Sequence, residues 1–347
     1  MDSSQGGGVD SPSLRAALTR RLHRRTSATG RIAVPAVPGM LEEYVDMCDD
    51  IFVGIGVHFT ESELDQLREA IAGQLAAAFT ASPRSEVVIE WESPIGTVVN
   101  YTVHAHWAGV GDLYDTWVDT RQGSLFGTEP DAKALSLAVA AGDPAGCPVL
   151  DIGAGTGRNA LTMARRGHEV DALEMTAKFA AALRREAAAS ALPLRVIEAD
   201  LFSEIDSLRR DYRLIIMSEV ASDFRSVEQL RAAFGIAAAH LADDGRFVTN
   251  VFITRDGYVP DAAAQQLGEQ CYSRMFTPEE VAQAASAASL AIESDESVYD
   301  FEKAHLPSIA WPPTQWYEEW VTGRDVFDLP RDEVPMELRW LVLRHAS

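Results

Sequence analysis

The chain has 347 residues, of which 47% are hydrophobic and 24% charged. This balance is typical of a soluble globular protein and excludes a largely disordered or fibrous chain. With 30 basic against 52 acidic side chains the formal net charge is -22, so nucleic acid and anionic membranes are poor partners, and a small neutral or cationic molecule is the better candidate.

The sequence also predicts a cytoplasmic location. The cysteines Cys48, Cys147 and Cys271 are widely spaced and form no CxxC pair, as is usual in a reducing compartment. No stretch approaches about 18 uninterrupted apolar residues. Residues 1–10 are rich in serine and glycine rather than basic and apolar. We therefore expect neither a membrane span nor a secretion signal.

Residues 1–30 are expected to be a flexible arm, and residues 31–130 a lid or dimerisation region. The arm opens with glycine and serine and then carries a cluster of arginines. In the second region, apolar residues at helical spacing predict a helix over about 40–54, and a Thr-x-x-Glu capping box at Thr60 starts another. Alternating apolar residues over 86–107 predict a β-hairpin. A homodimer formed through this region is one alternative, and a cover over a binding site is the other.

From about residue 131 the pattern changes to alternating helices and strands. Asp131, next to Pro130, is a suitable residue at the start of a helix. Strands are expected at 148–152, 169–174, 194–198, 214–218, 245–253, 291–299 and 336–344. Strand, helix and strand in this repeated order predict an α/β fold, with a doubly wound, seven-stranded and mostly parallel sheet over residues 131–347.

The loop after the first of these strands is the most informative motif in the chain. It reads Asp-Ile-Gly-Ala-Gly-Thr-Gly over residues 151–157, and a helix follows directly. Gly153, Gly155 and Gly157 let the backbone turn tightly and approach a ligand without a Cβ atom in between. The spacing is GxGxG, whereas the loop of dinucleotide-binding dehydrogenases, the main competitor, is GxGxxG.

Acidic residues end the next two strands. Glu174 lies 17 residues after Gly157, where its carboxylate can accept both hydroxyl groups of a ribose. Asp200 follows the third strand, and a carboxylate there can accept a hydrogen bond from an exocyclic amine. The alternative is that each acid caps a helix or faces solvent, but their joint spacing with the glycine loop favours a binding site.

Together these motifs resemble the class I S-adenosyl-L-methionine-dependent methyltransferases, and the resemblance covers residues 148–347. The segment 336–344 is similar to the antiparallel last strand that distinguishes this superfamily. The resemblance implies S-adenosyl-L-methionine as cofactor and S-adenosyl-L-homocysteine as product. It places the methionine part at Asp151 and the glycine loop, the ribose at Glu174 and the adenine near Asp200. The residues expected to bind the cofactor are Asp151, Gly153, Ala154, Gly155, Gly157, Asn159, Glu174, Met175, Asp200, Leu201, Phe202 and Glu219.

The segment after the fourth strand supplies the main candidate catalytic groups. Glu219 is the first choice for a proton acceptor or substrate-orienting group, Asp223 is the second, and His104 of the hairpin is the third. Quinone-type O-methyltransferases often read Glu-x-x-x-His here, and Asp223 takes the place of that histidine. Glu219 and Glu228 have the spacing of the double-glutamate loop of protein arginine methyltransferases, but the Trp-Met-Gly between them is absent. His104 and His106 share a strand face with no further ligand nearby, so no metal site is expected.

A set of aromatic and polar residues is expected to contact the acceptor. Many of its rings lie in an insertion at about 300–335, which emerges on the active-site side because the last strand is antiparallel. Such rings either form an apolar lid over an aromatic substrate or pack the insertion against the core. The residues expected to bind the substrate are Trp107, Tyr114, Trp117, Asn250, Tyr258, Trp311, Trp316 and Tyr317.

The predicted function is methyl transfer to a small molecule. The appended N-terminal region, the aromatic insertion and the lack of a basic groove are similar to bacterial enzymes of secondary metabolism, and the indole C3-methyltransferases give the sharpest hypothesis. For an indole, the ring carbon is the nucleophile, and Glu219 or a histidine takes the N–H proton. The alternatives are N- or O-methylation of another small metabolite, a tellurite-detoxifying methyltransferase, whose core this chain also resembles, and a non-catalytic cofactor-binding regulatory subunit.

Overall fold

The computed structural model describes residues 11–23, 25–82, 84–94, 98–107, 127–203, 207–255, 257–271 and 274–346. The chain divides into two compact units, Met1–Leu113 and Tyr114–Ser347. Each unit has its own hydrophobic core.

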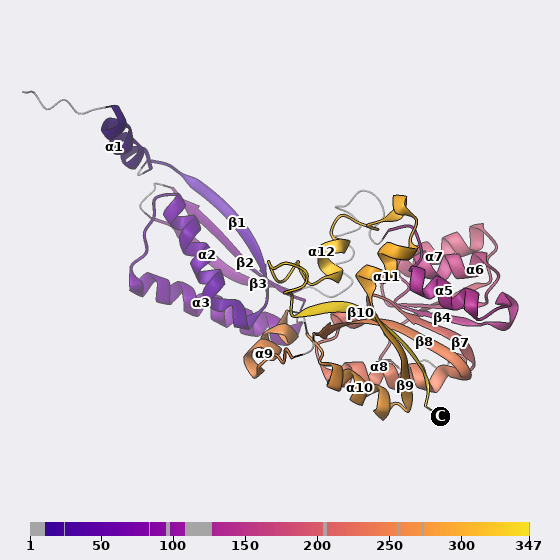
Figure 1. Cartoon of the computed structure of the whole chain (residues 1–347). Helices are drawn as coiled ribbons and strands as arrows, with labels where there is room; N and C mark the ends of the chain where they lie inside the picture. The colour runs from indigo at the N-terminus through magenta and orange to yellow at the C-terminus, as the bar shows by residue number, and fades with distance from the viewer. Residues whose placement is uncertain are drawn as a thin grey trace, which may run out of the picture. The chain divides into compact units, whose positions relative to one another are not determined.

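The N-terminal unit is a small antiparallel sheet with helices packed against it (Figure 1). Its strands, in sheet order, are β1 (Ala28–Pro35), β2 (Glu86–Ser93) and β3 (Asn100–His106), and its packed helices are α2 (Leu41–Gly54) and α3 (Glu61–Ala81). The predicted helices and hairpin are therefore confirmed. The capping box is also present, because the Thr60 side chain accepts the Glu63 N–H and the Glu63 carboxylate accepts the Thr60 N–H at 2.8 Å.

Strand β1 is the element of this unit that the sequence does not predict. It contains Gly30 and Pro35, two residue types that weaken a strand pattern. Gly30 is required by tertiary packing, because a Cβ atom there would lie 2.0 Å from Cζ2 of Trp91 on β2. Pairing with β2 along its whole length therefore stabilises β1 where local propensity does not. Within the segment expected to be an arm, residues Ser11–His23 form helix α1.

The C-terminal unit alternates strands and helices along the chain. Its elements are α5 (Ala132–Ala140), β4 (Val149–Ile152), α6 (Arg158–Arg165), β5 (Val170–Glu174), α7 (Ala177–Ala189), β6 (Leu194–Glu198), β7 (Tyr212–Met217), α8 (Val227–His240), β8 (Leu241–Thr254), α9 (Ala262–Gln270), α10 (Pro278–Ala287), β9 (Leu290–Ser297), α11 (Val298–His305), α12 (Tyr317–Val321) and β10 (Met336–His345). The strands form one seven-stranded sheet in the order β6-β5-β4-β7-β8-β10-β9. Strand β10 is antiparallel to both of its neighbours, and the other described pairings in this sheet are parallel. The predicted doubly wound, mostly parallel sheet is confirmed.

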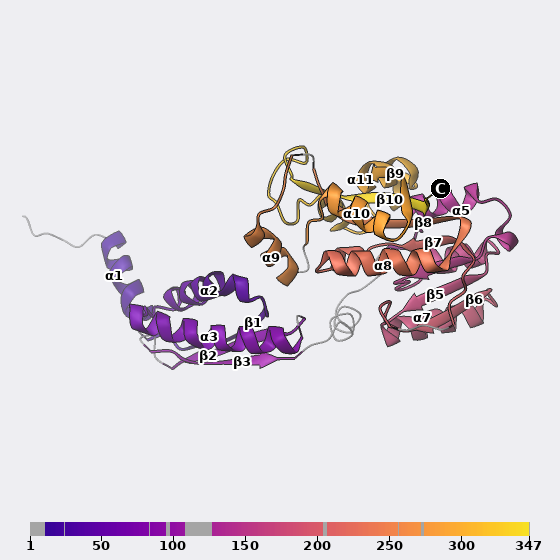
Figure 2. The same ribbon diagram turned by 90° about the horizontal axis from the view of Figure 1, so that it is seen from below.

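Helices cover both faces of this sheet (Figures 1 and 2). On one face, α8 and α10 pack over a core that includes Phe234 and Phe247. On the other face, α5, α6, α11 and α12 pack over a core that includes Met163 and Trp340. The two-sided burial explains why the central strands read as continuous apolar runs in the sequence.

One predicted boundary shifts for a local reason. The expected strand 291–299 ends at Ser297, where helix α11 begins. The Ser297 side chain accepts the backbone N–H of Asp300 at 3.4 Å, which is the hydrogen bond of a helix N-cap. The pattern of apolar residues does not predict where this strand ends, because Val298 and Tyr299 suit a strand as well as a helix.

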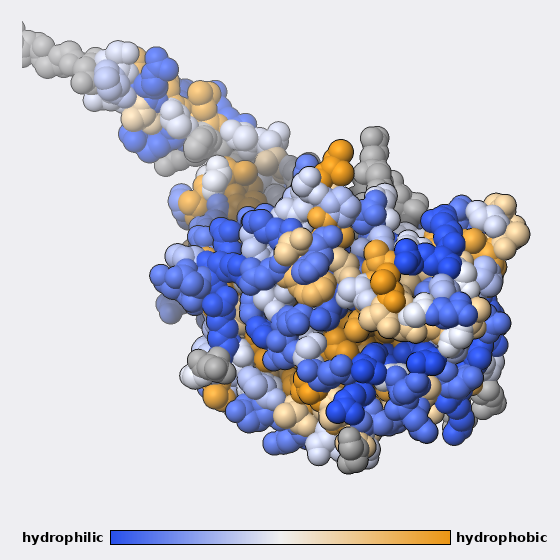
Figure 3. Space-filling view, turned by 45° about the vertical axis from the view of Figure 1, so that its right-hand side comes forward, coloured by the Kyte–Doolittle hydropathy of each residue, from blue (hydrophilic) through white to orange (hydrophobic). Residues whose placement is uncertain are grey.

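Charged and polar side chains cover most of the molecular face that Figure 3 shows, and apolar side chains appear on it in small groups. This distribution agrees with the strongly acidic composition. None of the helices in the described ranges is long and apolar enough to cross a membrane.

Candidate active site

The candidate site lies at the carboxyl edge of the large sheet, where the strand order reverses. The chain runs outward from β4 to β5 and β6, and then returns to place β7 on the other side of β4. In open α/β sheets, ligands bind beyond the carboxyl ends of the strands at such a point. The loops after β4, β5, β6 and β7, which hold most of the predicted site residues, all begin at this edge.

The glycine loop between β4 and α6 has a backbone that side chains would prevent. Gly153, Gly155 and Gly157 have φ angles of 70°, 55° and 93°, in the left-handed region that favours glycine. A Cβ atom at Gly153 would lie 2.4 Å from a methyl group of Val220, and one at Gly157 would lie 2.3 Å from Cδ2 of Leu183. The glycines therefore allow a tight turn that packs closely against Val220 and Leu183.

Glu174, at the end of β5, is fixed against this loop. One carboxylate oxygen accepts the Gly155 N–H at 2.7 Å, and the other accepts the Thr176 N–H at 2.6 Å. A carboxylate has about four lone-pair positions, so each oxygen can still accept a hydroxyl group. Glu174 is buried and held by backbone alone, which presets its orientation.

The residues after β6 form a more open part of the edge. Asp200 is exposed, and its Oδ1 accepts the Phe202 N–H at 2.7 Å. Leu201 packs against the core, whereas Phe202 and Met175 are exposed apolar side chains. The Phe202 ring lies 5.7 Å from the ring of Phe224. An exposed carboxylate among exposed apolar groups suits a planar heterocycle with an exocyclic amine.

Asp151 is a buried acid one residue before the end of β4. Its Oδ2 has no hydrogen-bond partner among the described residues. Burial raises the pKa of Asp151 to about 7, with the carboxylates of Asp131 and Glu174 adding to the rise, while the Ala160 N–H and Arg158 oppose it. An unsatisfied buried acceptor is costly, so this atom is suited to a donor group on a ligand.

Glu219 lies two residues after the end of β7 and has an unusual backbone. Its φ angle is 59°, a left-handed value that is strained for a residue other than glycine. One carboxylate oxygen, Oε1, lies 2.5 Å from Nη2 of Arg158. Burial raises the pKa of Glu219, and Arg158 opposes this rise. Asp223 lies four residues after Glu219 and is half-buried in the short helix Ala221–Asp223.

Two residues predicted to bind ligands, Asn250 and Asn159, make hydrogen bonds within the protein. Asn250 is buried, its Oδ1 accepts the Glu219 N–H at 2.7 Å, and its Nδ2 donates to Ser218 Oγ at 3.3 Å. Asn159 exchanges two hydrogen bonds with Asp131, at 2.9 and 2.8 Å. The oxygen and the nitrogen of each amide thus have a partner within the protein, and the predicted roles of Asn250 at the substrate and Asn159 at the cofactor stay predictions. Asn250 holds the strained segment after β7, and Asn159 holds the segment before α5.

The aromatic insertion has Tyr317 at its centre. The Tyr317 ring lies 5.8 Å from Trp311, 6.2 Å from Trp316 and 6.1 Å from Trp320, measured between ring centroids. Trp320 meets Phe252 of β8 edge-on at 5.5 Å. Tyr317 is buried, whereas Trp311 and Trp316 are half-buried. Part of the cluster therefore packs the insertion against the core, and part of it keeps exposed surface. Tyr258 is half-buried and packs against the same core.

Four other predicted residues lie either outside the described residues or in the N-terminal unit. Tyr114 and Trp117 lie outside the described residues. His104 and Trp107 belong to the N-terminal unit, where both side chains are exposed. Among the residues that the structure describes, no group of three or more histidine, cysteine or acidic side chains is arranged to hold a metal ion.

Three functional candidates were not singled out by the sequence pattern. Arg158 follows the last glycine of the loop and contacts Glu219, Asp131 pairs with Arg158, and Glu302 of the insertion binds the start of α5. Only Arg158 has a sequence signal, its place directly after Gly157. The other two are brought to the site by tertiary contacts.

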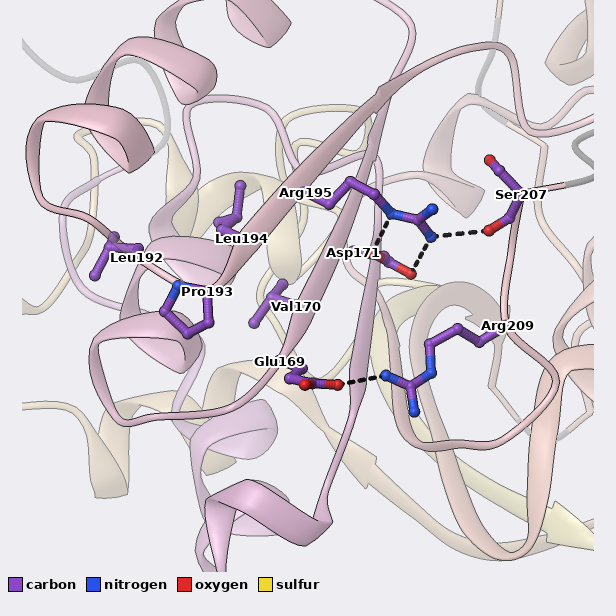
Figure 4. A pocket seen from close by; sticks show the side chains of 9 residues that line it. All are labelled: Glu169, Val170, Asp171, Leu192, Pro193, Leu194, Arg195, Ser207 and Arg209. Carbon is purple, nitrogen blue, oxygen red and sulfur yellow. Dashed lines mark hydrogen bonds and ion pairs between the residues drawn. The ribbon is translucent and has the colours of Figure 1, made fainter.

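A separate hollow of about 680 Å³ lies at the amino edge of the same sheet (Figure 4). It is lined by residues at the starts of β5 and β6 and by Ser207 and Arg209. Arg195 pairs with Asp171 at 2.6 Å, and Arg209 pairs with Glu169 at 2.5 Å (Figure 4). Its arginines are therefore bound to protein carboxylates, and it lies at the opposite end of the strands from the glycine loop.

Comparison with known proteins identifies the core of this unit. Residues 149–245 match the model of a methyltransferase domain family. No curated protein sequence matches the chain. A putative sarcosine dimethylglycine methyltransferase from Galdieria sulphuraria is 16% identical, with 69% of this chain and 99% of that chain covered and a TM-score of 0.50.

Two further solved structures are similar in outline. A geranyl diphosphate C-methyltransferase from Streptomyces coelicolor A3(2) is 13% identical over 66% of this chain and 92% of its own, with a TM-score of 0.45. The O-methyltransferase from a trans-AT PKS multienzyme of Brevibacillus brevis is 15% identical over 62% of this chain and 72% of its own, with a TM-score of 0.46.

The sheet order and the antiparallel last strand of the C-terminal unit are those of the class I methyltransferase fold, and residues 149–245 within it match a methyltransferase domain. Residues 149–245 are therefore a methyltransferase domain, and S-adenosyl-L-methionine is the cofactor that the sequence predicts for it. The residues at the carboxyl edge fit this cofactor, because the carboxylate of Glu174 keeps lone-pair positions for hydroxyl groups and Asp151 offers a buried oxygen without a partner among the described residues.

Proposed function

We propose that the protein methylates a small aromatic molecule, and that an indole ring carbon is the acceptor to test first. The observation that supports this choice is the position of the aromatic cluster. Burial, together with the nearby carboxylates of Asp131, Glu219 and Glu302, raises the pKa of Tyr317. The half-buried rings of Trp311 and Trp316 adjoin Tyr317. A flat acceptor held against these rings would lie close to the carboxylate of Glu219.

On this proposal the loops divide the binding of S-adenosyl-L-methionine between them. Glu174 accepts hydrogen bonds from the ribose hydroxyls, and the unused oxygen of Asp151, with the glycine loop, faces the methionine part. Asp200, Leu201 and Phe202 frame the adenine. The bound cofactor supplies an electrophilic methyl carbon. Glu174→Ala should weaken binding of the cofactor or its product by about 1–3 kcal/mol, whereas Glu198→Ala, at the exposed end of β6, should leave it unchanged.

Glu219 is the group that we place at the acceptor. Its Oε1 is bound by Arg158, and Oε2 remains to accept a proton or a hydrogen bond from the acceptor. For an indole, this proton is the N–H proton that is lost when the ring carbon attacks. Burial raises the pKa of Glu219, which strengthens it as a base.

An amine acceptor is the second candidate. Asp131 and Glu219 provide two carboxylates around the single guanidinium of Arg158, and a cationic ammonium group would balance the remaining negative charge. Aromatic rings such as those of Trp311 and Trp316 also attract cations. An ammonium group must lose a proton before it can be methylated, and Glu219 would accept that proton as well.

Transfer of an isotopic methyl label from S-adenosyl-L-methionine to a panel of indoles, phenols, amines and tellurite tests the proposal. We expect label in an indole or another aromatic acceptor, and a loss of about 100-fold or more in kcat for Glu219→Gln, as is usual when a general base is removed. Glu228→Gln is the matched control, because Glu228 is exposed in the first turn of α8. Label in amines alone would favour the second candidate. Cofactor binding without transfer to any acceptor would favour a regulatory subunit.

A further inference from the structure

The guanidinium of Arg158 lies between two carboxylates that come from different parts of the fold. Nη1 lies 2.8 Å from Oδ1 of Asp131, which precedes α5, and Nη2 lies 2.5 Å from Oε1 of Glu219, which follows β7. Nη2 is also 3.4 Å from the hydroxyl oxygen of Ser218. The exposed fractions of the Arg158, Asp131 and Glu219 side chains are 9%, 1% and 13%. Arg158 is therefore a buried link between the glycine-loop helix and the candidate proton acceptor.

The Asp131 end of this link is held rigidly. The backbone N–H of Asp131 donates to Oδ1 of Asn159, and Oδ2 of Asp131 accepts a hydrogen bond from Nδ2 of Asn159. It makes no side-chain cap for α5. Glu302 instead accepts the N–H groups of Ala132 and Lys133, at 2.8 and 3.1 Å. Because another residue caps the helix, the Asp131 carboxylate is available to fix the guanidinium.

The Glu219 end is also restrained, but its carboxylate is used only in part. Asn250 holds the Glu219 backbone N–H, and Arg158 holds Oε1. The titratable groups that face this carboxylate are Arg158 from α6, Asp131 from the segment before α5 and Tyr317 from α12. Arg158 is the cation among these three.

We propose that Arg158 is a positioning residue for methyl transfer, which keeps Glu219 ionised and directs its free oxygen toward the acceptor. The assignment rests on the role of Glu219 in the proposed function. A buried ion pair contributes little net stability compared with well-packed apolar residues, so stability alone does not account for this arrangement. A backbone strained at φ 59° at the carboxyl edge of the sheet also indicates a functional constraint on Glu219.

The variants Arg158→Gln and Arg158→Lys test the proposal against Arg165→Gln. Arg165 lies on the same helix and pairs with Glu186 at the surface, where its side chain is 52% exposed. The first measurement is the titration of the Glu219 carboxyl carbon by NMR of 13C-glutamate-labelled protein. The signal is assigned by its absence in Glu219→Gln. This titration requires no acceptor, so the measurement stays informative even if no acceptor is found.

We expect the titration midpoint of Glu219 to rise by about one pH unit or more in Arg158→Gln, because an opposite charge has been removed. It should stay near the wild-type value in Arg158→Lys and in Arg165→Gln. With an active acceptor, kcat of Arg158→Gln should fall about 100-fold, the usual cost of a misplaced group. The acidic limb of the pH profile of kcat should move to higher pH in this variant. Affinity for S-adenosyl-L-homocysteine should change less than threefold, and Arg158→Lys should recover part of kcat.

An unchanged Glu219 titration in Arg158→Gln would overturn the assignment, even if kcat fell, because the loss would then be structural. If Arg158→Gln does not fold, Arg158→Lys decides the question. A lysine cannot bridge both carboxylates as a planar guanidinium does, so full kcat in that variant would also overturn the assignment. If the titration shifts as expected but the wild-type protein methylates nothing in the panel, the proposed function fails and the link between Arg158 and Glu219 stands.

Discussion

The carboxylate of Glu302 accepts the backbone N–H of Ala132 at 2.8 Å, across 170 positions in the sequence. Its other oxygen accepts the N–H of Lys133 and, at 3.0 Å, the indole N–H of Trp340. One side chain of the insertion thus satisfies the first turn of α5 and ties it to β10. The insertion is part of the folded core of this unit. Its position depends on the hydrogen bonds between Glu302 and the first turn of α5, which no local sequence pattern predicts.

The first prediction concerns this cap. Glu302→Gln replaces a carboxylate oxygen with an amide N–H₂ group, which cannot accept the hydrogen bonds that α5 and Trp340 donate. At pH 8 we expect the free energy of unfolding to fall by about 1–3 kcal/mol, as measured by urea denaturation. Glu279→Gln, an exposed first-turn residue of α10, should change it by less than about 0.5 kcal/mol. Equal stability of the two variants would show that the cap is dispensable.

The second prediction is a pH dependence carried by Asp151. The pKa of this acid is raised from 3.8 to about 7 in the folded protein. Between about pH 4 and pH 7 the folded state holds a proton that the unfolded chain has lost, so this acid lowers the free energy of unfolding as pH rises. Glu302, whose pKa is also raised to about 7 by burial, acts in the same direction.

Asp151→Asn removes one of these two groups. We expect wild type to lose more stability than Asp151→Asn when the pH is raised from 5 to 8, with both followed by urea denaturation. The cofactor carries positive charge, so its binding should release a proton from Asp151 near pH 6.5, which calorimetry in buffers of different ionisation enthalpy detects. Parallel stability curves for the two proteins would contradict the assignment.

The third prediction concerns the glycine loop. Gly157→Ala places a Cβ atom 2.3 Å from Leu183 and forces a left-handed φ of 93° on a residue with a side chain. We expect a loss of more than about 1 kcal/mol in stability and weaker cofactor binding by calorimetry. Gly235→Ala, in α8, has no atom within 4 Å of the added Cβ and should stabilise the protein by about 0.5–1 kcal/mol. Loss of stability in both variants would show that the clash is not specific to the loop.

The residues that the sequence could identify are those whose role is fixed locally. The succession of strands and helices along the chain, the glycine loop and the position of Glu174 all follow from periodicity and spacing within short stretches. Strand β1 was missed because pairing with β2, and not its own composition, stabilises it. Asp131 was recognised only as the start of a helix, since its contact with Arg158 depends on a cap from Glu302 far along the chain.

The same reasoning explains the assignments that remain open. Asn250 and Asn159 follow the expected elements, but the sequence could not show that neighbouring backbone and side chains already satisfy their amides. The roles of residues 31–130 as lid or dimer contact, and a cytoplasmic location, stay predictions.

The last prediction separates the two functions of the aromatic insertion. Both tryptophans are half-buried, but Trp320 packs edge-on against Phe252 of β8, whereas the ring contacts of Trp316 within the described chain are with Tyr317 and Trp320. We therefore expect Trp320→Ala to lower the free energy of unfolding by about 3 kcal/mol. Trp316→Ala should mainly raise the KM for the acceptor, with cofactor affinity unchanged. Steady-state kinetics at saturating cofactor, together with thermal unfolding, distinguish these outcomes. If Trp316→Ala destabilises the protein as much as Trp320→Ala and leaves the KM unaltered, the insertion serves only to pack against the core, and the acceptor must be bound by other residues.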